Sequence, residues 1–348
     1  MEKKNCFVVG AGMTGMKLAS MFDENAILIS TAKQDSANFT LKKAKVNIVS
    51  EDGASKRFSV GQEIWSRNIG TLKEILKDVN NDKVVVFSSL GGGSGSSSLS
   101  YITDILLKQN NKVLVVGIVP YKKEINPPLA NSVQAINSLM PYIPKASVIL
   151  FDNDKLIKLY NNDWSQINEH IIKRVNYLVN LLDKFTIDSY SPLTIDRSEL
   201  MSVVFGGGFV DVSNDFLEEV NPKFHYGKID VNTKNLLIAQ FVDVSVPDDK
   251  VDEYHKILTT VTNKFATRAK NCRFVTGILR GKIDKETIPE GSPNDRAYIT
   301  IASGLNIDDY IKKIEKIRDD AVQRAINYST EMKVESIVTD NDAVVLDI

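Results

Sequence analysis

The stretch from Ser88 to Ser98 has the residue types of a phosphate-binding turn, because it combines four glycines with serine hydroxyls. An apolar, β-branched run at 83–87 precedes it and a run with helical apolar spacing at 99–107 follows, which predicts strand, turn and helix. Glycines let backbone approach a ligand closely, and the free N–H groups of a helix start favour an anion. We therefore expect a di- or triphosphate here, and the alternative is a flexible linker. Further donors are the hydroxyls of Ser94, Ser96, Ser97 and Ser98.

A second glycine motif, Gly10 to Gly15, reads G-x-G-x-x-G and follows a predicted strand at 5–9. A helix over 16–22 and a strand over 26–30 complete a βαβ unit. A nicotinamide-dependent oxidoreductase would place an acid at the end of the second strand, to hold the ribose. Ser30 stands there, and the next acid is Asp35. The motif thus favours a nucleotide other than NAD, with an oxidoreductase kept as an alternative.

The elements that position these turns alternate between strand and helix, which predicts a doubly wound parallel sheet of the α/β class. Ligands of such sheets bind beyond the carboxyl ends of the strands, where both glycine turns would lie. A long central helix and a second, smaller α/β domain are expected to follow. The expected strands are 112–119, 147–151, 235–244, 273–280 and 296–303, and the expected helices are 68–79, 132–140, 163–185, 197–205, 249–265 and 307–328. Residues 41–60 suggest a short hairpin or irregular insert, and 206–208 a break.

Composition narrows the class of protein. The 348 residues are 43% hydrophobic and carry a formal net charge of -1, so no overall field favours nucleic acid or an anionic membrane. The two cysteines and three histidines lack the spacing of zinc ligands. We expect a cytoplasmic protein, with no signal peptide, no membrane span and no metal held by a protein cluster.

Several segments, taken in order, resemble the tubulin/FtsZ family over the whole chain. Gly91–Ser97 is similar to the family signature GGGTG[TS]G, with Ser97 in place of the last glycine. Leu150–Leu156 resembles the family's IPNDKL segment, and Thr194–Glu199 resembles its NxDxxD loop. Gly10–Gly15 matches the first nucleotide loop. Short length, sparse alanine and the lack of a long tail with an end peptide resemble the TubZ branch of clostridial phages and plasmids more than FtsZ.

The resemblance implies a polymerising GTPase of the tubulin/FtsZ fold that binds GTP, GDP and Mg²⁺. Trp164 would stack on guanine, Asn168 would read its edge, and Asp196 and Glu199 would be catalytic by activating water. Magnesium would be held mostly by water and phosphates, because Ala32 stands near the position of a usual family acid. The implied nucleotide-binding residues are Gly10, Ala11, Gly12, Met13, Gly15, Gly91, Gly92, Gly93, Ser94, Gly95, Ser96, Ser97, Glu124, Asn153, Trp164 and Asn168.

Each match also has an ordinary structural explanation. Trp164 would serve as a core aromatic at a helix start, and Asn168 as a solvated helix residue. Asn153 would cap a turn. Asp196 and Glu199 would be helix-start acids that satisfy the helix dipole. The arginine that commonly follows the ribose-contacting Glu124 is missing, and Pro128 stands near its place.

The central helix separates the base-reading residues from the acidic loop. Some 17 helical residues at ~1.5 Å each make about 25 Å, so Asp196 and Glu199 would act on a neighbouring subunit's nucleotide. Such a head-to-tail contact builds a filament when it does not close. The resemblance further implies a DNA-binding adaptor on centromere-like DNA as the partner, without direct DNA or membrane binding. An FtsZ-like division protein and a non-hydrolysing filament remain alternatives.

The expected division is a nucleotide-binding domain over 1–162, the central helix over 163–187, a C-terminal activation domain over 188–306, and a helix with an acidic tail over 307–348.

Overall fold

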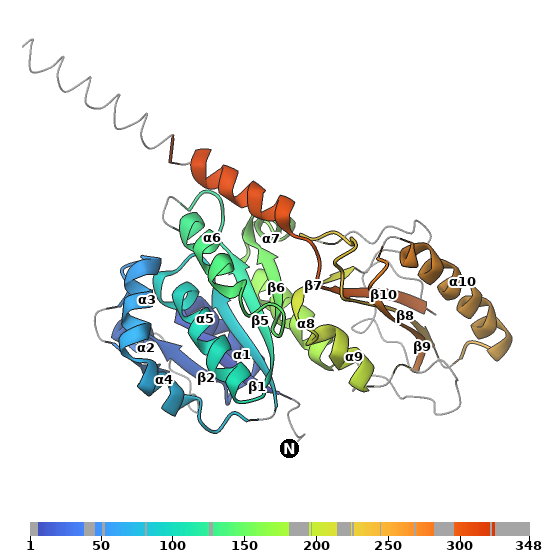
Figure 1. Ribbon diagram of the computed structural model, residues 1–348, viewed down its shortest axis with the longest axis horizontal. Coiled ribbons are helices and arrows are strands. Elements are labelled where there is room, and N and C mark those ends of the chain that lie inside the picture. The colour runs from blue at the N-terminus through green and yellow to red at the C-terminus, as the bar shows by residue number, and fades with distance from the viewer. Residues whose placement is uncertain are drawn as a thin grey trace, which may run out of the picture.

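The computed structural model describes residues 6–37, 46–50, 53–80, 82–124, 128–180, 195, 197–213, 224, 226–243, 245–267, 269–281, 296–320 and 322–323. Across these residues, the strands join into a ten-stranded sheet of order β3-β2-β1-β4-β5-β6-β7-β10-β8-β9 (Figure 1). Its strands are β1 (Phe7–Ala11), β2 (Ile27–Ser30), β3 (Val46–Ile48), β4 (Lys83–Ser89), β5 (Lys112–Val119), β6 (Ser147–Asp152), β7 (Gly208–Ser213), β8 (Asn235–Asp243), β9 (Arg273–Gly281) and β10 (Arg296–Ser303).

The helices cover this sheet. They are α1 (Gly12–Phe22), α2 (Lys33–Ala37), α3 (Phe58–Arg67), α4 (Ile69–Ile75), α5 (Gly93–Lys108), α6 (Pro128–Leu139), α7 (Asn153–Leu159), α8 (Trp164–Asn180), α9 (Arg197–Val204) and α10 (Asp248–Ala266). A further helix covers residues 308–320. In Figure 1 it lies across the top of the first half of the molecule, beside α6 and α7.

The strands from β3 to β7 run parallel, as the alternation of strands and helices predicts. Apolar residues fill β4 and β5 on both faces, because helices pack on both sides of a parallel sheet. Helix α5 packs on these two strands and against α3 and α6, while α1 packs on β1 and β4 and against α8. One row of paired residues crosses five strands, namely Ile29, Ala11, Ser88, Gly117 and Leu150. The carboxyl ends of these strands therefore lie side by side.

Strand β7 joins the two halves of the sheet. It pairs parallel with β6 on one side and antiparallel with β10 on the other. Strand β10 is also antiparallel to β8, whereas β8 and β9 are parallel, and α10 packs on β8 and β9. The second part of the chain is thus a mixed continuation of the first sheet. Sequence reading found a break at 206–208 but not the strand that starts at Gly208, because a buried Asp211 interrupts its apolar pattern.

Several sequence expectations are wrong in detail. Residues 46–48 are not part of a hairpin, since β3 pairs parallel with β2. The expected helix 68–79 corresponds to α4 alone, and the helix α3 that precedes it begins at Phe58 and was not expected. Helix α5 starts at Gly93 and not at Leu99, so half of the glycine–serine stretch is helical. Helix α8 is described as far as Asn180, and its expected continuation to 187 lies outside the described residues. Among the described residues, no helix is both long and apolar enough to cross a membrane.

Candidate functional site

The two glycine motifs meet at the carboxyl edge of the sheet. Gly12 has a positive φ of +68°, which favours glycine, and a Cβ on it would lie 2.8 Å from the backbone N of Gly95. A Cβ on Gly95 would in turn lie 2.7 Å from the carbonyl oxygen of Ala11. Both positions therefore require glycine to allow the two turns to touch. The contact makes one site of two motifs that are about 80 residues apart in the sequence.

Both turns lead into helices whose first N–H groups are not capped by side chains. The residues before them, Ala11 for α1 and Gly92 for α5, make no capping hydrogen bond, and neither helix has an acid in its first turn. A Cβ on Gly92 would meet no atom within 4 Å, so this glycine faces open space. Two uncapped helix N-termini beside an open backbone suit an anion such as a phosphate.

The serines of α5 turn toward their own helix. Ser97 donates to the carbonyl oxygen of Gly93 at 2.5 Å and Ser98 to that of Gly95 at 2.7 Å, while Ser96 donates to that of Gly92. All three side chains are fully buried. Their hydroxyl hydrogens are thus committed, which corrects the expectation that they donate to a ligand. Ser97 stands where the family signature has a glycine. Gly61 of α3 leaves room for its side chain, because a Cβ added to Gly61 would lie 2.1 Å from the Ser97 Oγ.

Ser94 holds the phosphate turn against two other elements. Its Oγ accepts a hydrogen bond from the backbone N–H of Thr31, just beyond β2, at 3.1 Å. Its carbonyl oxygen accepts one from the Nε1 of Trp65, a fully buried residue of α3, at 3.0 Å. The Thr31 hydroxyl is itself buried without a hydrogen-bond partner among the described residues. The sequence did not single out Thr31 or Trp65, and Trp65 lies in a helix that was not expected.

Asn131 of α6 connects the phosphate turn to the turn that precedes α3. Its Nδ2 donates to the carbonyl oxygens of Gly91 at 2.8 Å and Lys56 at 2.9 Å, and its Oδ1 accepts from the N–H of Phe58 at 3.2 Å. Ser55 and Lys56 adopt positive φ values of 47° and 55°, which are strained for residues with a side chain. Asn131 is 3% exposed, and because the expected helix began at residue 132, the sequence pattern did not single it out.

The residues expected to read the base lie at the start of α8 and α7. Trp164 is 48% exposed, so it is not a core aromatic, and Asn168 is only 8% exposed, so it is not a solvated helix residue. Asp152, not Asn153, caps α7 by accepting from the N–H of Asp154 at 2.9 Å. The Oδ1 of Asn153 is buried and has no hydrogen-bond partner among the described residues. An unpartnered buried amide at this edge is available to a ligand.

The loops beside these residues are held by short-range hydrogen bonds. Glu124 is exposed, and its carboxylate accepts from the N–H of Tyr121 at 3.0 Å. Asp163 caps α8 by accepting from the N–H groups of Ser165 and Gln166. The hydrogen bonds from Gln166 hold the pKa of the Asp163 carboxyl below its usual range. Trp164 is thus presented by a capped helix start.

The acidic loop is only partly described. Glu199 lies in the first turn of α9, which packs against α8 and on β8 and β10. Asp196 lies outside the described residues. Among the described residues, no group of three or more His, Cys, Asp or Glu side chains is arranged to hold a metal. Glu199 is therefore placed on the second half of the molecule, and its role stays a prediction.

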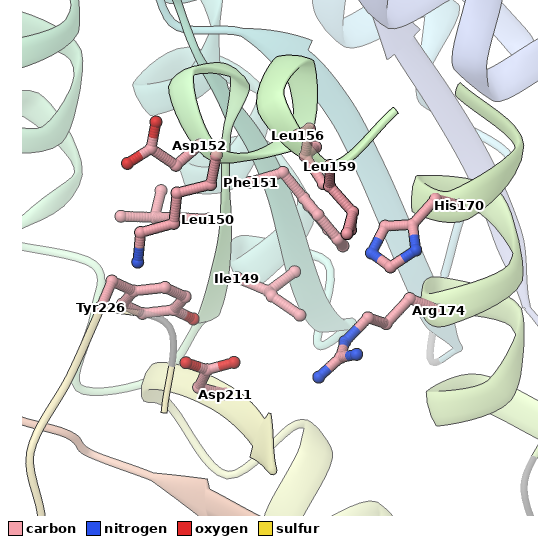
Figure 2. A pocket seen from close by; sticks show the side chains of 11 residues that line it. Ile149, Leu150, Phe151, Asp152, Leu156, Leu159, His170, Arg174, Asp211 and Tyr226 are labelled. Atoms are coloured by element: carbon pink, nitrogen blue, oxygen red, sulfur yellow. The ribbon is translucent and has the colours of Figure 1, made fainter. Parts of the chain in front are cut away.

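A cavity of about 200 Å³ that sequence reading did not find lies between β6, α7, α8 and β7. Figure 2 shows Arg174 of α8 and Asp211 of β7 on its floor, with His170 above them. Arg174 donates to the carbonyl oxygen of Val212 at 2.6 Å, and His170 Nδ1 lies 2.7 Å from the Tyr160 hydroxyl. The Arg174 contact ties the helix that begins at Trp164 to the strand that joins the two halves of the sheet, and the His170 contact ties it to the end of α7.

Comparison with known proteins identifies the first half of the chain. Residues 6–161 match the family model described as Tubulin/FtsZ family, GTPase domain. This segment is a tubulin/FtsZ GTPase domain. Its glycine turns, Asn153 and the strands that carry them all lie within the matched residues.

Individual relatives extend the likeness beyond that domain. The tubulin-like protein TubZ of Bacillus cereus is 24% identical over 232 residues, which are 59% of this chain and 53% of TubZ. A GTPγS-form protofilament structure of Bacillus thuringiensis serovar israelensis TubZ has a TM-score of 0.74 at 13% identity, covering 94% of both chains. The Clostridium botulinum phage c-st TubZ structure has a TM-score of 0.63 at 16% identity, covering 92% of this chain and 99% of that one. The protein therefore has the tubulin/FtsZ fold. The chain spans about half the length of the curated relatives it matches.

Proposed function

We propose that the protein binds GTP and hydrolyses it as part of a head-to-tail filament. The observation that carries this proposal is the contact between Gly12 and Gly95, which joins two glycine turns at one edge of the sheet. An oxidoreductase would use Gly10–Gly15 alone and would leave the second turn without a role. Two uncapped helix starts facing one space suit a chain of phosphates better than a single dinucleotide bridge.

The roles within one subunit follow from the positions of the residues. The phosphates rest on the N-termini of α1 and α5, where backbone N–H groups donate to their oxygens. Trp164 is exposed enough to stack on the base, and the amides of Asn153 and Asn168 supply both donors and acceptors to a guanine edge. Glu124 contacts the ribose. Magnesium, when bound, neutralises phosphate charge and is held mostly by water and the phosphates themselves.

Hydrolysis needs the acidic loop of a second subunit. Helix α8 has 17 residues, and at ~1.5 Å each it is about 25 Å long. Glu199 and Asp196 follow this helix in the chain, whereas Trp164 begins it. We therefore place these acids against the γ-phosphate of a neighbour, where they polarise the attacking water.

We further propose that the filaments segregate plasmid or phage DNA through a DNA-binding adaptor. The sequence after Ser329 carries Glu331, Glu335, Asp340, Asp342 and Asp347 against one lysine, Lys333. An acidic segment suits a basic adaptor. FtsZ proteins also occur among the relatives, so a division-type cytoskeletal role is the second candidate. Truncation at Ser329 should abolish adaptor binding but not assembly, and binding that survives truncation would contradict the adaptor proposal.

The concentration dependence of turnover tests the shared site. GTPase activity is expected to be negligible below a critical protein concentration and to rise steeply above it. A rate proportional to concentration through the origin would mean that one subunit carries the complete site.

Mixing two inactive variants tests the assignment of the acids. Asp196→Ala keeps the nucleotide pocket and loses the acid. Gly92→Asp keeps the acids, and its carboxylate caps α5 where a phosphate would bind. The space around Gly92 accepts this side chain, whereas a large residue at Gly93 would meet the backbone of Arg57 at 2.8 Å. Co-assembled mixtures should regain some turnover, and a co-sedimentation control shows that both variants enter the filament. Co-assembly without turnover would place the acids in their own subunit's site.

A further inference from the structure

The helix over 308–320 lies beside the ends of β5 and β6, which lead into loops of the candidate nucleotide site. Tyr310 is 7% exposed and Ile314 is 3% exposed, so this face of the helix is part of the core. A narrow cleft separates it from the ends of β5 and β6. The other residues that border the cleft come from the ends of β5 and β6 and from the starts of α6 and α7, namely Val119, Pro120, Leu129, Asp152 and Asp154.

One line of contact leads from this helix to the phosphate turn. Ile314 and Ile317 border the cleft opposite Pro120. A Cβ on Gly91 would lie 3.0 Å from the Cβ of Pro120, so the proline is in close contact with the turn. Pro120 therefore lies between Gly91 and the cleft that this helix borders.

A second line leads to the base and the ribose. Asp152 and Tyr310 both border the cleft, and burial together with the Asp152 carboxylate raises the pKa of Tyr310 well above its usual range. Asp152 caps α7 through the N–H of Asp154, and the Asp154 carboxylate accepts from the N–H of Lys122 at 3.0 Å. Asn153 is the first residue of α7, and Glu124 lies two residues beyond Lys122.

The Tyr310 hydroxyl is buried and makes no hydrogen bond of standard geometry with the described residues. The Asp152 carboxylate is the nearby partner of this hydroxyl, but the contact is poorly aligned. A poorly aligned buried donor costs free energy, which a small movement toward Asp152 would recover. Such a movement shifts α7 and the turn of Lys122 together, because Asp152 and Asp154 link them.

Resting on the proposed function, we propose that Tyr310 is a positioning residue for the nucleotide site. Guanine nucleotide held by Asn153 and Glu124 closes the hydrogen bond from Tyr310 to Asp152 and draws helix 308–320 onto the domain. Because binding linkage is reciprocal, the helix strengthens nucleotide binding by the factor by which the nucleotide strengthens helix packing. The nucleotide state thereby reaches the segment of chain that follows residue 320.

The test compares Tyr310→Phe with the matched variant Tyr226→Phe. The Tyr226 ring lies 5.9 Å from that of Tyr310, but its hydroxyl donates to the carbonyl of Val210. Full-length protein is titrated with GDP below its assembly concentration, and hydrogen exchange of residues 308–320 is measured with and without GDP.

For Tyr310→Phe we expect GDP affinity to fall by roughly three- to tenfold, the equivalent of one hydrogen bond. Its melting temperature without nucleotide should stay close to that of the wild type, since the hydroxyl makes no well-aligned hydrogen bond to lose. GDP should slow exchange of 308–320 in the wild type and do so less in Tyr310→Phe. Tyr226→Phe should melt earlier and keep both the affinity and the GDP-dependent protection.

Two failures are distinguishable. If the wild type binds no guanine nucleotide, the proposed function fails, and this inference fails with it. If the wild type binds GDP and Asn153→Ala weakens that binding, but Tyr310→Phe keeps the wild-type affinity or protection, only the inference is overturned. An equal loss of affinity in Tyr226→Phe would also overturn it, because the effect would then follow from stability. GDP-independent exchange of 308–320 in a wild type that binds GDP contradicts the coupling without any variant.

Discussion

Replacing Gly92 by alanine should lower GTP affinity without lowering the stability of the fold. Gly92 is the N-cap of α5, with φ -76° and ψ 160°, values that alanine adopts without strain. A Cβ built there meets no protein atom within 4 Å. The fold therefore gives no reason for a glycine at this position. A phosphate resting on the first N–H groups of α5 does, because a methyl group would hold it away.

The expected magnitudes differ sharply between stability and binding. The free energy of unfolding should change by no more than about 0.5 kcal/mol or rise slightly, since alanine restricts the unfolded chain. Losing one charge-assisted hydrogen bond to a phosphate costs about 1.5–3 kcal/mol, which is roughly 10- to 150-fold in GTP affinity. Urea unfolding and calorimetric titration with GTP measure the two quantities on the same preparation.

Gly70→Ala is the matched control. Gly70 of α4 is exposed, has no atom within 4 Å of an added Cβ, and lies outside both glycine turns. This variant should gain stability, because alanine is the better helix former, and should bind GTP as the wild type does. Wild-type GTP affinity in Gly92→Ala would refute the placement of a phosphate at the start of α5.

Three further variants probe the surroundings of the site. Trp164→Ala should weaken GTP binding tenfold or more, on a stacking contribution of roughly 1–3 kcal/mol, with little change in melting temperature because the ring is 48% exposed; a wild-type titration would exclude stacking. Asn131→Ala leaves the carbonyl of Gly91 without its donor, so it should lower the free energy of unfolding by about 2 kcal/mol or more and weaken GTP binding. Asn137→Ala on the exposed face of α6 should change neither quantity. Ser55→Gly should raise the free energy of unfolding by about 1 kcal/mol, because it relieves a φ of 47°, while Ser59→Gly inside α3 should lower it. Chemical unfolding that shows the same sign of change for both variants would contradict backbone strain at Ser55.

The parallel strands and their glycine turns could be predicted because their signals are local. A run such as Lys83–Ser89, apolar on both faces, fits a buried parallel strand, and the glycines that follow it mark the turn. Register then brings Ala11 and Ser88 side by side, so the meeting of the two motifs follows from the fold class. The exposed Trp164 and the buried Asn168 match what their proposed roles require.

What the sequence did not predict depends on contacts between distant segments. Helix α3 was missed because a glycine interrupts its apolar pattern, and the reason for Gly61 is the Oγ of Ser97 on another helix. The hydroxyls of Ser96–Ser98 look like ligand donors until the helix start at Gly93 brings carbonyl acceptors within their reach. The places of Asn131 and Tyr310 depend on partners at Gly91 and Asp152, which no local pattern specifies.

Titration of the full chain with GTP and with ATP tests the central claim most directly. We predict saturable GTP binding, and at least about tenfold weaker ATP binding, because Asn153 and Asn168 present amides that pair with the guanine edge. Equal affinity for the two nucleotides would contradict the assignment of the base-reading residues. Failure to bind either nucleotide would contradict the site itself.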